Sequence, residues 1–219
     1  EIIINNLKKN KLINEIYIAS GSYKNNKIFV EKLRPKFKNL KFFFYDDEEN
    51  VTKRIYKITK KIKNKYSVLI SGDCVLIDNF FIKRLYKKLK DNSEYDFVYC
   101  NKKVQHEGIK VFKTQAWNEV NKKSNLKIFQ ENPGYVIKKK PRFFKIIFLK
   151  PLKYESGKVS RLSVDTQSDL DFFDTINKYL KNKKKDFSFK NASYYDCFKK
   201  FSFLNNHVNR KKPGKYINR

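Results

Sequence analysis

The chain has 219 residues, 40% hydrophobic and 16% aromatic, which suffices for one α/β domain with a sizeable core. No apolar run approaches the length of a bilayer span and no signal peptide is visible, so we expect a cytoplasmic protein without membrane partners. The three cysteines (Cys74, Cys100 and Cys197) are widely spaced, which fits reduced thiols better than a disulfide framework or a zinc site.

The net charge is +29, from 51 Lys and Arg against 22 Asp and Glu. A charge of this size indicates nucleic-acid binding when the basic residues form one patch. Here the lysines are spread along the chain, and Lys, Asn, Ile, Phe and Tyr are abundant while Gly, Pro and Trp are scarce, a bias typical of AT-rich genomes. We therefore favour a compositional origin of the charge over nucleic-acid binding. A basic field would still attract a nucleotide or an acidic sugar.

The first twelve residues predict a helix, because Ile3, Leu7 and Leu12 fall on one side of it. A doubly wound domain usually begins with a strand rather than a helix. The chain also begins at Glu1 and contains no methionine. We therefore expect that a segment preceding this helix is missing.

Apolar strands and amphipathic helices then alternate with short connections. This rhythm is typical of an α/β domain whose mostly parallel, Rossmann-like sheet is covered by helices on both faces, giving three layers. We expect strands at 15–20, 40–45, 68–71 and 96–100, and helices at 28–37, 51–62 and 79–89.

After Asn101 the rhythm loosens, and the prediction has two parts. Residues 1–180 form the main domain, with further strands at 109–112, 143–149 and 162–165 and helices at 115–121 and 167–180. Residues 181–219 begin with a basic run and form a peripheral C-terminal segment. Its aromatic residues would dock it on the domain or on a second subunit, as in a homodimer; they are Tyr194, Tyr195, Phe198, Phe201 and Phe203.

Asp73 is the first candidate for chemistry, because it directly follows a buried strand and Gly72. Glycine permits close backbone approach, and a carboxylate at a strand end suits a hard cation that completes its shell with water and phosphate oxygens. The alternative is a turn aspartate that bonds nearby backbone N–H groups. Asp78, five residues on, is most simply a helix N-cap.

Asp165 has the same predicted setting: an apolar strand, a carboxylate and a helix start. Thr166 can cap that helix, with Asp169 at the position where a capping box has Glu or Gln. A cap or turn role for Asp165 is again the alternative. If both aspartates end strands of one parallel sheet, they converge on the same crevice, which favours a shared metal.

Four segments, in this order, resemble the cytidylyltransferase family that includes the spore coat polysaccharide biosynthesis protein F group and, more distantly, the CMP-sialate and CMP-Kdo synthetases. Two contain the aspartates: SGDCVLID is similar to the metal-binding segment of the family, and RLSVDTQSDL to its VDTPEDL segment. The other two give support. The segments are LKKNKLINEIYIAS (7–20), SGDCVLID (71–78), RLSVDTQSDL (161–170) and LNNHVNRK (204–211).

The resemblance implies a nucleotide-diphospho-sugar transferase sheet of the GT-A-like type and transfer of CMP from CTP to an acidic sugar for surface polysaccharide or glycan synthesis. Asp73 and Asp165 would be the catalytic ligands of Mg²⁺. His106 aligns with a family loop near the sugar, although an exposed loop residue is the alternative. Arg161 would bind phosphate or carboxylate, or simply pair with an acid. The implied substrate-binding set is Ser20, Gly21, Gly72, His106 and Arg161.

The chain departs from the family in two places. Nothing in it matches the Gly/Ser/Arg/Lys-rich loop that cradles CTP, so we expect a fragment without that loop to be inactive or nearly so. Asn132 also stands where the family has a histidine, which affects the sugar side of the site. The competing hypothesis is therefore a degenerate, non-catalytic relative or a basic nucleic-acid-binding module.

Overall fold

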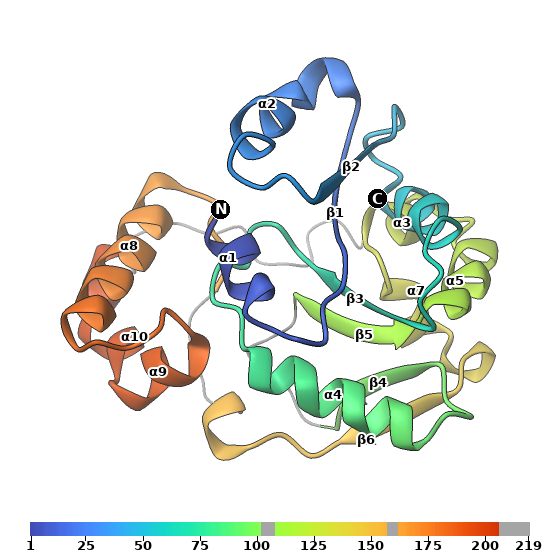
Figure 1. The fold of residues 1–219 in the computed structure, drawn as a ribbon. Coiled ribbons are helices and arrows are strands. Elements are labelled where there is room, and N and C mark those ends of the chain that lie inside the picture. Colours follow the sequence, from blue (N-terminus) through green and yellow to red (C-terminus); the bar gives the residue numbers. More distant parts are fainter. Residues whose placement is uncertain (102–107, 157–161, 206–219) are drawn as a thin grey trace.

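The fold is known from a computed structural model that describes residues 1–101, 108–156 and 162–205 (Figure 1). Helices and strands alternate through the first hundred residues, and the α/β class is confirmed. The strands are β1 (Ile16–Ser20), β2 (Leu40–Phe44), β3 (Tyr66–Ile70), β4 (Phe97–Cys100), β5 (Ile109–Lys113) and β6 (Ile146–Leu149).

The described strands form two sheets. β1 and β2 pair in parallel, with Ile16 opposite Leu40. The other four strands have the order β3-β5-β4-β6. β5 is antiparallel to both of its neighbours, while β4 and β6 are parallel, so β3, β4 and β6 point the same way and β5 alone is reversed. The larger sheet is therefore mixed, as is common in α/β folds.

Helices cover both faces of the larger sheet, which gives the three layers. On one face α1 (Ile2–Lys8) and α4 (Asn79–Asp91) pack against Val98 and Val111. On the other face four helices pack around Phe97 and Phe112. They are α3 (Val51–Thr59), α5 (Trp117–Lys123), α6 (Lys127–Glu131) and α7 (Tyr135–Lys139), while α2 (Tyr23–Leu33) joins β1 to β2.

Alternation along the strands decides which residue faces which layer. Phe97 lies opposite Phe112 in the β4–β5 register, and Val98 lies opposite Val111. Because successive side chains of a strand point to opposite faces, the two phenylalanines enter one helical layer and the two valines enter the other. All four are at most 3% exposed, and full burial of each such side chain stabilises the fold by roughly 1.5–3 kcal/mol.

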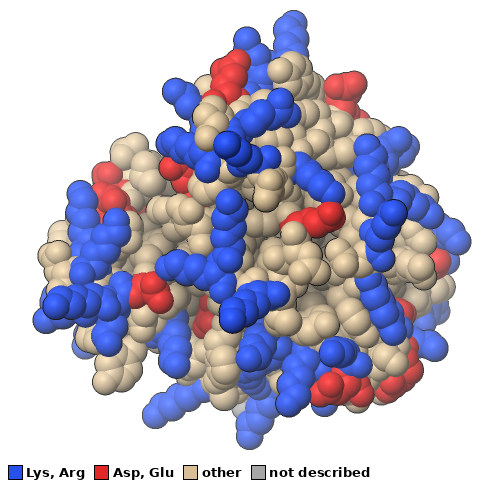
Figure 2. All heavy atoms as spheres, in the orientation of Figure 1, with Lys and Arg blue, Asp and Glu red and all other residues tan. Residues whose placement is uncertain are grey.

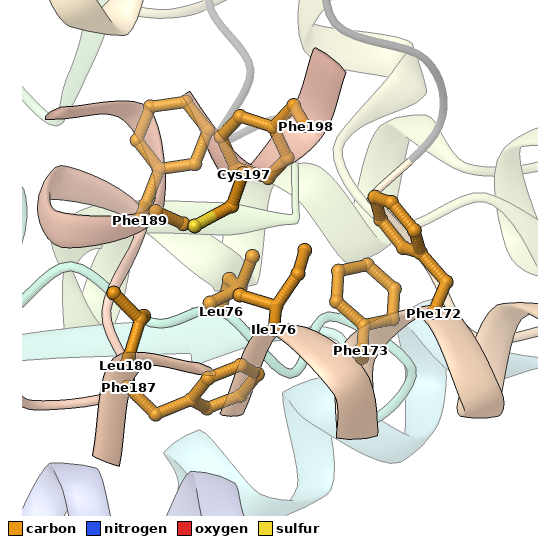
Figure 3. Close-up of a cluster of buried hydrophobic side chains, with 10 residues drawn as sticks. Leu76, Phe172, Phe173, Ile176, Leu180, Phe187, Phe189, Cys197 and Phe198 are labelled. Atoms are coloured by element: carbon orange, nitrogen blue, oxygen red, sulfur yellow. The ribbon is translucent and has the colours of Figure 1, made fainter. Parts of the chain in front are cut away.

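A second apolar core lies to one side of the sheet and is built by α8 (Gln167–Asn182), α9 (Phe189–Tyr194) and α10 (Cys197–Lys200) (Figure 1). Figure 3 shows Phe173 and Ile176 of α8 near Leu76, with Phe189 and Phe198 on the opposite side of the cluster. The described residues after 180 therefore continue the core that α8 begins, and Leu76 connects this core to the segment that follows β3.

Several predicted boundaries differ from the structure. α2 ends at Leu33, with Arg34 still in a helical conformation (φ −59°, ψ −42°), because the next residue, Pro35, has no N–H to donate to a helical carbonyl. β6 starts only at Ile146, since a 3-10 turn covers 141–143. The short helices α6, α7, α9 and α10 were not predicted.

The predicted strand at 162–165 is wrong, because this segment is irregular backbone. Its alternating apolar residues, Leu162 and Val164, pack against the α8 core instead of joining a sheet. No helix in the described parts of the chain is long and apolar enough to cross a membrane.

Candidate active site

Asp73 is positioned by the turn that follows β3. The Ser71 amide donates to the carbonyl of Gly108 at 3.0 Å, which continues the β3–β5 pairing one residue past the strand. The Cys74 amide then donates to the Ser71 carbonyl at 3.1 Å and closes the turn. Asp73 lies at the apex and is exposed, as a substrate- or cation-binding carboxylate must be.

The segment that contains Asp165 is attached directly to this turn. The amide of Val164 donates to the carbonyl of Asp73 at 3.0 Å. The two aspartates therefore adjoin one backbone hydrogen bond, which connects two loops rather than two strand ends. Asp165 is also exposed, and Ser163 Oγ donates to its Oδ2 at 2.9 Å.

A capping box immobilises the backbone around Asp165. Asp169 Oδ2 accepts from the Thr166 amide at 3.1 Å and from the Asp165 amide at 3.2 Å, and Thr166 Oγ1 accepts from the Asp169 amide at 3.2 Å. Asp169 is fully buried, and its Oδ1 accepts from Asn205 Nδ2 at 3.3 Å. The predicted cap at the start of α8 is therefore confirmed.

Cys74 lies within the electrostatic field of both carboxylates. Burial first, and then the negative charge of Asp73 and its hydrogen bond with the thiol, raise the pKa of Cys74 to about 12; Asp165 contributes in the same direction and Lys110 opposes it. The thiol is therefore protonated at neutral pH and unsuited to nucleophilic attack.

The donor set suits a hard cation rather than a soft one. In the described parts of the chain no group of three or more His, Cys, Asp and Glu side chains could hold a metal. Mg²⁺ does not need such a cage, since one or two carboxylates with water and phosphate oxygens are enough. The two exposed aspartates, whose segments meet at the Val164–Asp73 hydrogen bond, fit that pattern.

The glycines of the site behave differently from each other. A Cβ on Gly108 would lie 2.3 Å from Cys74 Sγ, so this position has no room for a side chain. A Cβ on Gly72 would meet no described atom within 4 Å. The tight contact that the sequence led us to expect at Gly72 is therefore found at Gly108 instead. The sequence did not single out Gly108, because it lies between two segments with no clear apolar pattern.

Ser20 and Gly72 line the same cavity of about 850 Å³, which extends between β1 and β3. Ser20 Oγ also contacts Asn26 Oδ1 at 2.7 Å. Gly21 is buried against Glu48, whose carboxylate accepts from Ser22 and Asn25. Those hydrogen bonds, the one from Asn25 first, lower the pKa of Glu48. Of the substrate-binding candidates, the structure thus brings Ser20 and Gly72 to one cavity, while His106 and Arg161 lie outside the described residues.

A buried ion pair anchors the segment that leads back to the site. Arg84 Nη1 donates to Glu155 Oε2 at 2.6 Å, and Arg84 Nη2 donates to the carbonyl of Lys150 at 2.8 Å. The side chain of Glu155 is fully buried and that of Arg84 is 18% exposed. Next to it, Tyr154 Oη donates to Asp78 Oδ2 at 3.0 Å, and Asp78 caps α4 as predicted. Lys110 and Glu155 had no distinguishing sequence signal in so charged a chain.

The described fold is a Rossmann-like α/β fold with a mixed sheet, and the two aspartate segments meet beside the end of β3. The family model for cytidylyltransferases matches residues 1–214, and the chain belongs to this cytidylyltransferase family. It is 26% identical over 180 residues to an uncharacterized protein of Methanocaldococcus jannaschii, covering 82% of this chain and 72% of that one.

Two solved structures share the fold. A cytidylyltransferase from Leptospira borgpetersenii superposes with a TM-score of 0.77 at 16% identity, covering 96% of this chain and 87% of that one. A CMP:2-keto-3-deoxy-manno-octonic acid synthetase in complex with CTP superposes with a TM-score of 0.55 at 10% identity, covering 83% and 88%. At these identities the structures show a common fold, and the family match indicates nucleotidyltransferase activity.

The basic residues are not confined to one patch of the face shown in Figure 2. On the face shown in Figure 2, Lys and Arg are distributed over the whole surface, with Asp and Glu between them. This distribution agrees with a compositional origin of the +29 charge.

Proposed function

We propose that this protein transfers CMP from CTP to an acidic sugar, and so activates the sugar in the cytoplasm for surface polysaccharide or glycan synthesis. The observation that carries the proposal is the hydrogen bond between Val164 and Asp73, because it joins the two segments whose aspartates resemble the metal ligands of the family. The choice of CTP as the nucleotide rests on membership of the cytidylyltransferase family.

In the proposed reaction a sugar hydroxyl attacks the α-phosphorus of CTP. A new oxygen–phosphorus bond forms, the bond to the bridging oxygen breaks, pyrophosphate leaves and the hydroxyl proton is released. Asp73 and Asp165 would hold a Mg²⁺ ion, which neutralises and positions the phosphates. Asp169 would keep the Asp165 backbone in place through its bonds to the Asp165 and Thr166 amides. Lysine and arginine side chains around the site would help to bind pyrophosphate.

The direct test is release of pyrophosphate by the protein, with any native segment before Glu1 included, given CTP, Mg²⁺ and a panel of sugar acids. We expect release with at least one acid. Asp73→Asn and Asp165→Asn should each reduce turnover at least ~100-fold, as expected when a ligand of a charge-neutralising ion is lost. The matched control is Asp174→Asn, an exposed carboxylate of α8 that pairs with Lys178, and it should retain full activity.

The competing function is a non-catalytic relative or a basic nucleic-acid-binding module, favoured only by the +29 charge. It predicts salt-sensitive binding to RNA or DNA that is indifferent to Asp73→Asn and Asp165→Asn. Coding sequence upstream of Glu1 that specifies a strand and a Gly/Arg/Lys-rich loop would support the enzyme; a start codon directly before Glu1 would favour the competing function.

A further inference from the structure

Three neighbouring strands of the larger sheet present a row of side chains on one face. Tyr99 of β4 lies beside Phe148 of β6 in the parallel register. On the other side of β4, the register with β5 pairs Val98 with Val111. Because β4 and β5 are antiparallel, the next pair in that register is Tyr99 with Lys110. Partners in adjacent strands are about 4.8 Å apart and point to the same face, so Lys110, Tyr99 and Phe148 lie side by side.

The hydroxyl group of Tyr99 is buried and has no hydrogen-bond partner among the described residues. Burial raises the pKa of Tyr99, so the phenol keeps its proton at neutral pH and is able to donate it in a hydrogen bond. Buried hydroxyl groups without a partner are destabilising and rare in native proteins. This hydroxyl therefore needs an acceptor that the described residues do not supply.

Lys110 and the Tyr99 hydroxyl meet beside Gly134, the residue before α7. A Cβ on Gly134 would lie 3.3 Å from Lys110 Cε and 3.6 Å from Tyr99 Oη, so both atoms border the same small space. Gly134 has a φ of 82°, which other residues rarely adopt, and it places no side chain in that space. An ammonium and a phenol are both donors, and an anion can accept from both of them.

The row lies near the turn that holds Asp73. The Ser71 amide donates to the carbonyl of Gly108, two residues before Lys110. The positive charge of Lys110 also lowers the pKa of Cys74, the residue after Asp73, against the larger effect of burial. A ligand bound by Lys110 would therefore be near the candidate Mg²⁺ site without using its aspartates.

Phe148 adds an apolar surface to this polar pair. Its side chain is 56% exposed, whereas Ile146 of the same strand packs against the core. Sites for small molecules combine apolar or aromatic walls with a few placed polar groups. A sugar ring has an apolar face of C–H groups that suits an aromatic ring, and its substituents can reach polar neighbours. The three side chains together fit a sugar that carries a negative charge.

We propose that Lys110 and Tyr99 bind the carboxylate of the acidic sugar and that Phe148 packs against its ring. The Lys110 ammonium turns towards the carboxylate, which becomes the acceptor that the Tyr99 hydroxyl lacks. A singly charged carboxylate matches a single ammonium, whereas the phosphates of CTP are assigned to Mg²⁺ at the aspartates. The choice of an acidic sugar rests on the proposed function; the residues that select its acid group are new.

The test is isothermal titration calorimetry of the 219-residue protein, with CTP present and Mg²⁺ withheld. The probes are glucuronate, galacturonate and N-acetylneuraminate, each beside its uncharged methyl ester. We expect at least one acid to bind at least ~10-fold more tightly than its ester. Tyr99→Phe and Lys110→Met should each weaken that acid at least ~10-fold and leave the ester unchanged, because each removes a donor to a charged group.

The other variants separate the roles within the row. Phe148→Ala should weaken the acid and its ester equally, and Lys110→Arg should retain most of the affinity because it keeps the charge. Two matched controls should leave every probe unchanged. They are Tyr86→Phe, a partly buried tyrosine of α4, and Lys113→Met, on the opposite face of β5.

Melting temperature distinguishes a binding role of the Tyr99 hydroxyl from a structural one. Since this hydroxyl has no partner among the described residues, Tyr99→Phe should melt no lower than the unsubstituted protein. A clear fall in its melting temperature would assign the hydroxyl to folding and overturn its proposed role.

Equal affinity of the acid for the unsubstituted protein, Tyr99→Phe and Lys110→Met would also overturn the proposal, as would the lack of any preference for an acid over its ester. Pyrophosphate release is a separate measurement. Release with an acid whose binding ignores both substitutions would refute this site alone. Acid binding that needs both residues, without release, would refute the proposed reaction alone.

Discussion

The backbone amide of Val164 donates to the backbone carbonyl of Asp73 at 3.0 Å, although the two residues lie far apart in the sequence. This one bond aligns the loop after β3 with the loop before α8. Because it involves only backbone atoms, it positions the flanking carboxylate of Asp165 without using either carboxylate. The spacing of the candidate metal ligands therefore depends on it.

Val164→Pro tests this relationship, because proline has no N–H to donate. We expect at least a ~10-fold fall in kcat/KM for pyrophosphate release, with a stability loss of only ~1 kcal/mol, the net value of one hydrogen bond. Val164→Ala keeps the amide and is the control for lost side-chain packing. Equal kinetics in the two variants would show that the bond does not position Asp165.

Asp169→Ala removes a fully buried acceptor from the Asp165 and Thr166 amides and from Asn205. Hydrogen bonds to a charged group contribute roughly 1.5–3 kcal/mol, so we expect a loss of ~2–3 kcal/mol in urea unfolding. Asp171→Ala, an exposed residue of the same helix, should change stability by less than about 0.5 kcal/mol. A loss no larger than that of the control would contradict a structural role for the capping box.

Gly108→Ala should disturb the site through Cys74, since the new Cβ would lie 2.3 Å from Sγ. Overpacking of this kind costs roughly 1–3 kcal/mol. The displaced Cys74 should also move Asp73, so activity should fall more than stability explains. The double variant Gly108→Ala/Cys74→Ala removes Sγ and should regain most of both quantities. No recovery would show that Gly108 is required for another reason.

Glu155→Ala should leave Arg84 partly buried without its partner, because Arg84 Nη1 donates to both carboxylate oxygens. Breaking a buried pair in this way costs roughly 3–5 kcal/mol. The apolar pair Arg84→Met/Glu155→Leu should cost less than Glu155→Ala alone, because no uncompensated charge remains. Chemical denaturation of the three proteins checks the order, and the reverse order would contradict it.

Cys74 should resist alkylation in the folded protein, because burial raises its pKa to about 12. An unfolded thiol has a pKa near ~8.5, so between these two values only the unfolded chain loses the proton and stability falls as pH rises. Iodoacetamide labelling followed by mass spectrometry at pH 8.5 should give a rate at least ~100-fold slower than in urea. Equal rates would refute the protonated thiol.

Local patterns in the sequence predicted the elements whose pattern is unambiguous. Apolar residues spaced three and four apart predicted α3 and its buried face. Asp78 and Thr166, as N-caps, predicted where α4 and α8 begin. The Leu162–Asp165 strand was mispredicted because its alternating apolar residues pack on α8, which alternation alone cannot distinguish from packing in a sheet. The same limit applies to Gly108 and Lys110, whose importance depends on what lies beside them.

The sequence by itself determined the α/β class, the cytidylyltransferase resemblance and the choice of Asp73 and Asp165, because hydrophobic period, caps and short motifs are local properties. Only the tertiary structure decided how the two aspartates meet, through a bond between Val164 and Asp73 rather than through two strand ends. It also revealed the cavity between β1 and β3. Both features depend on contacts between distant segments, and these form only when the chain packs.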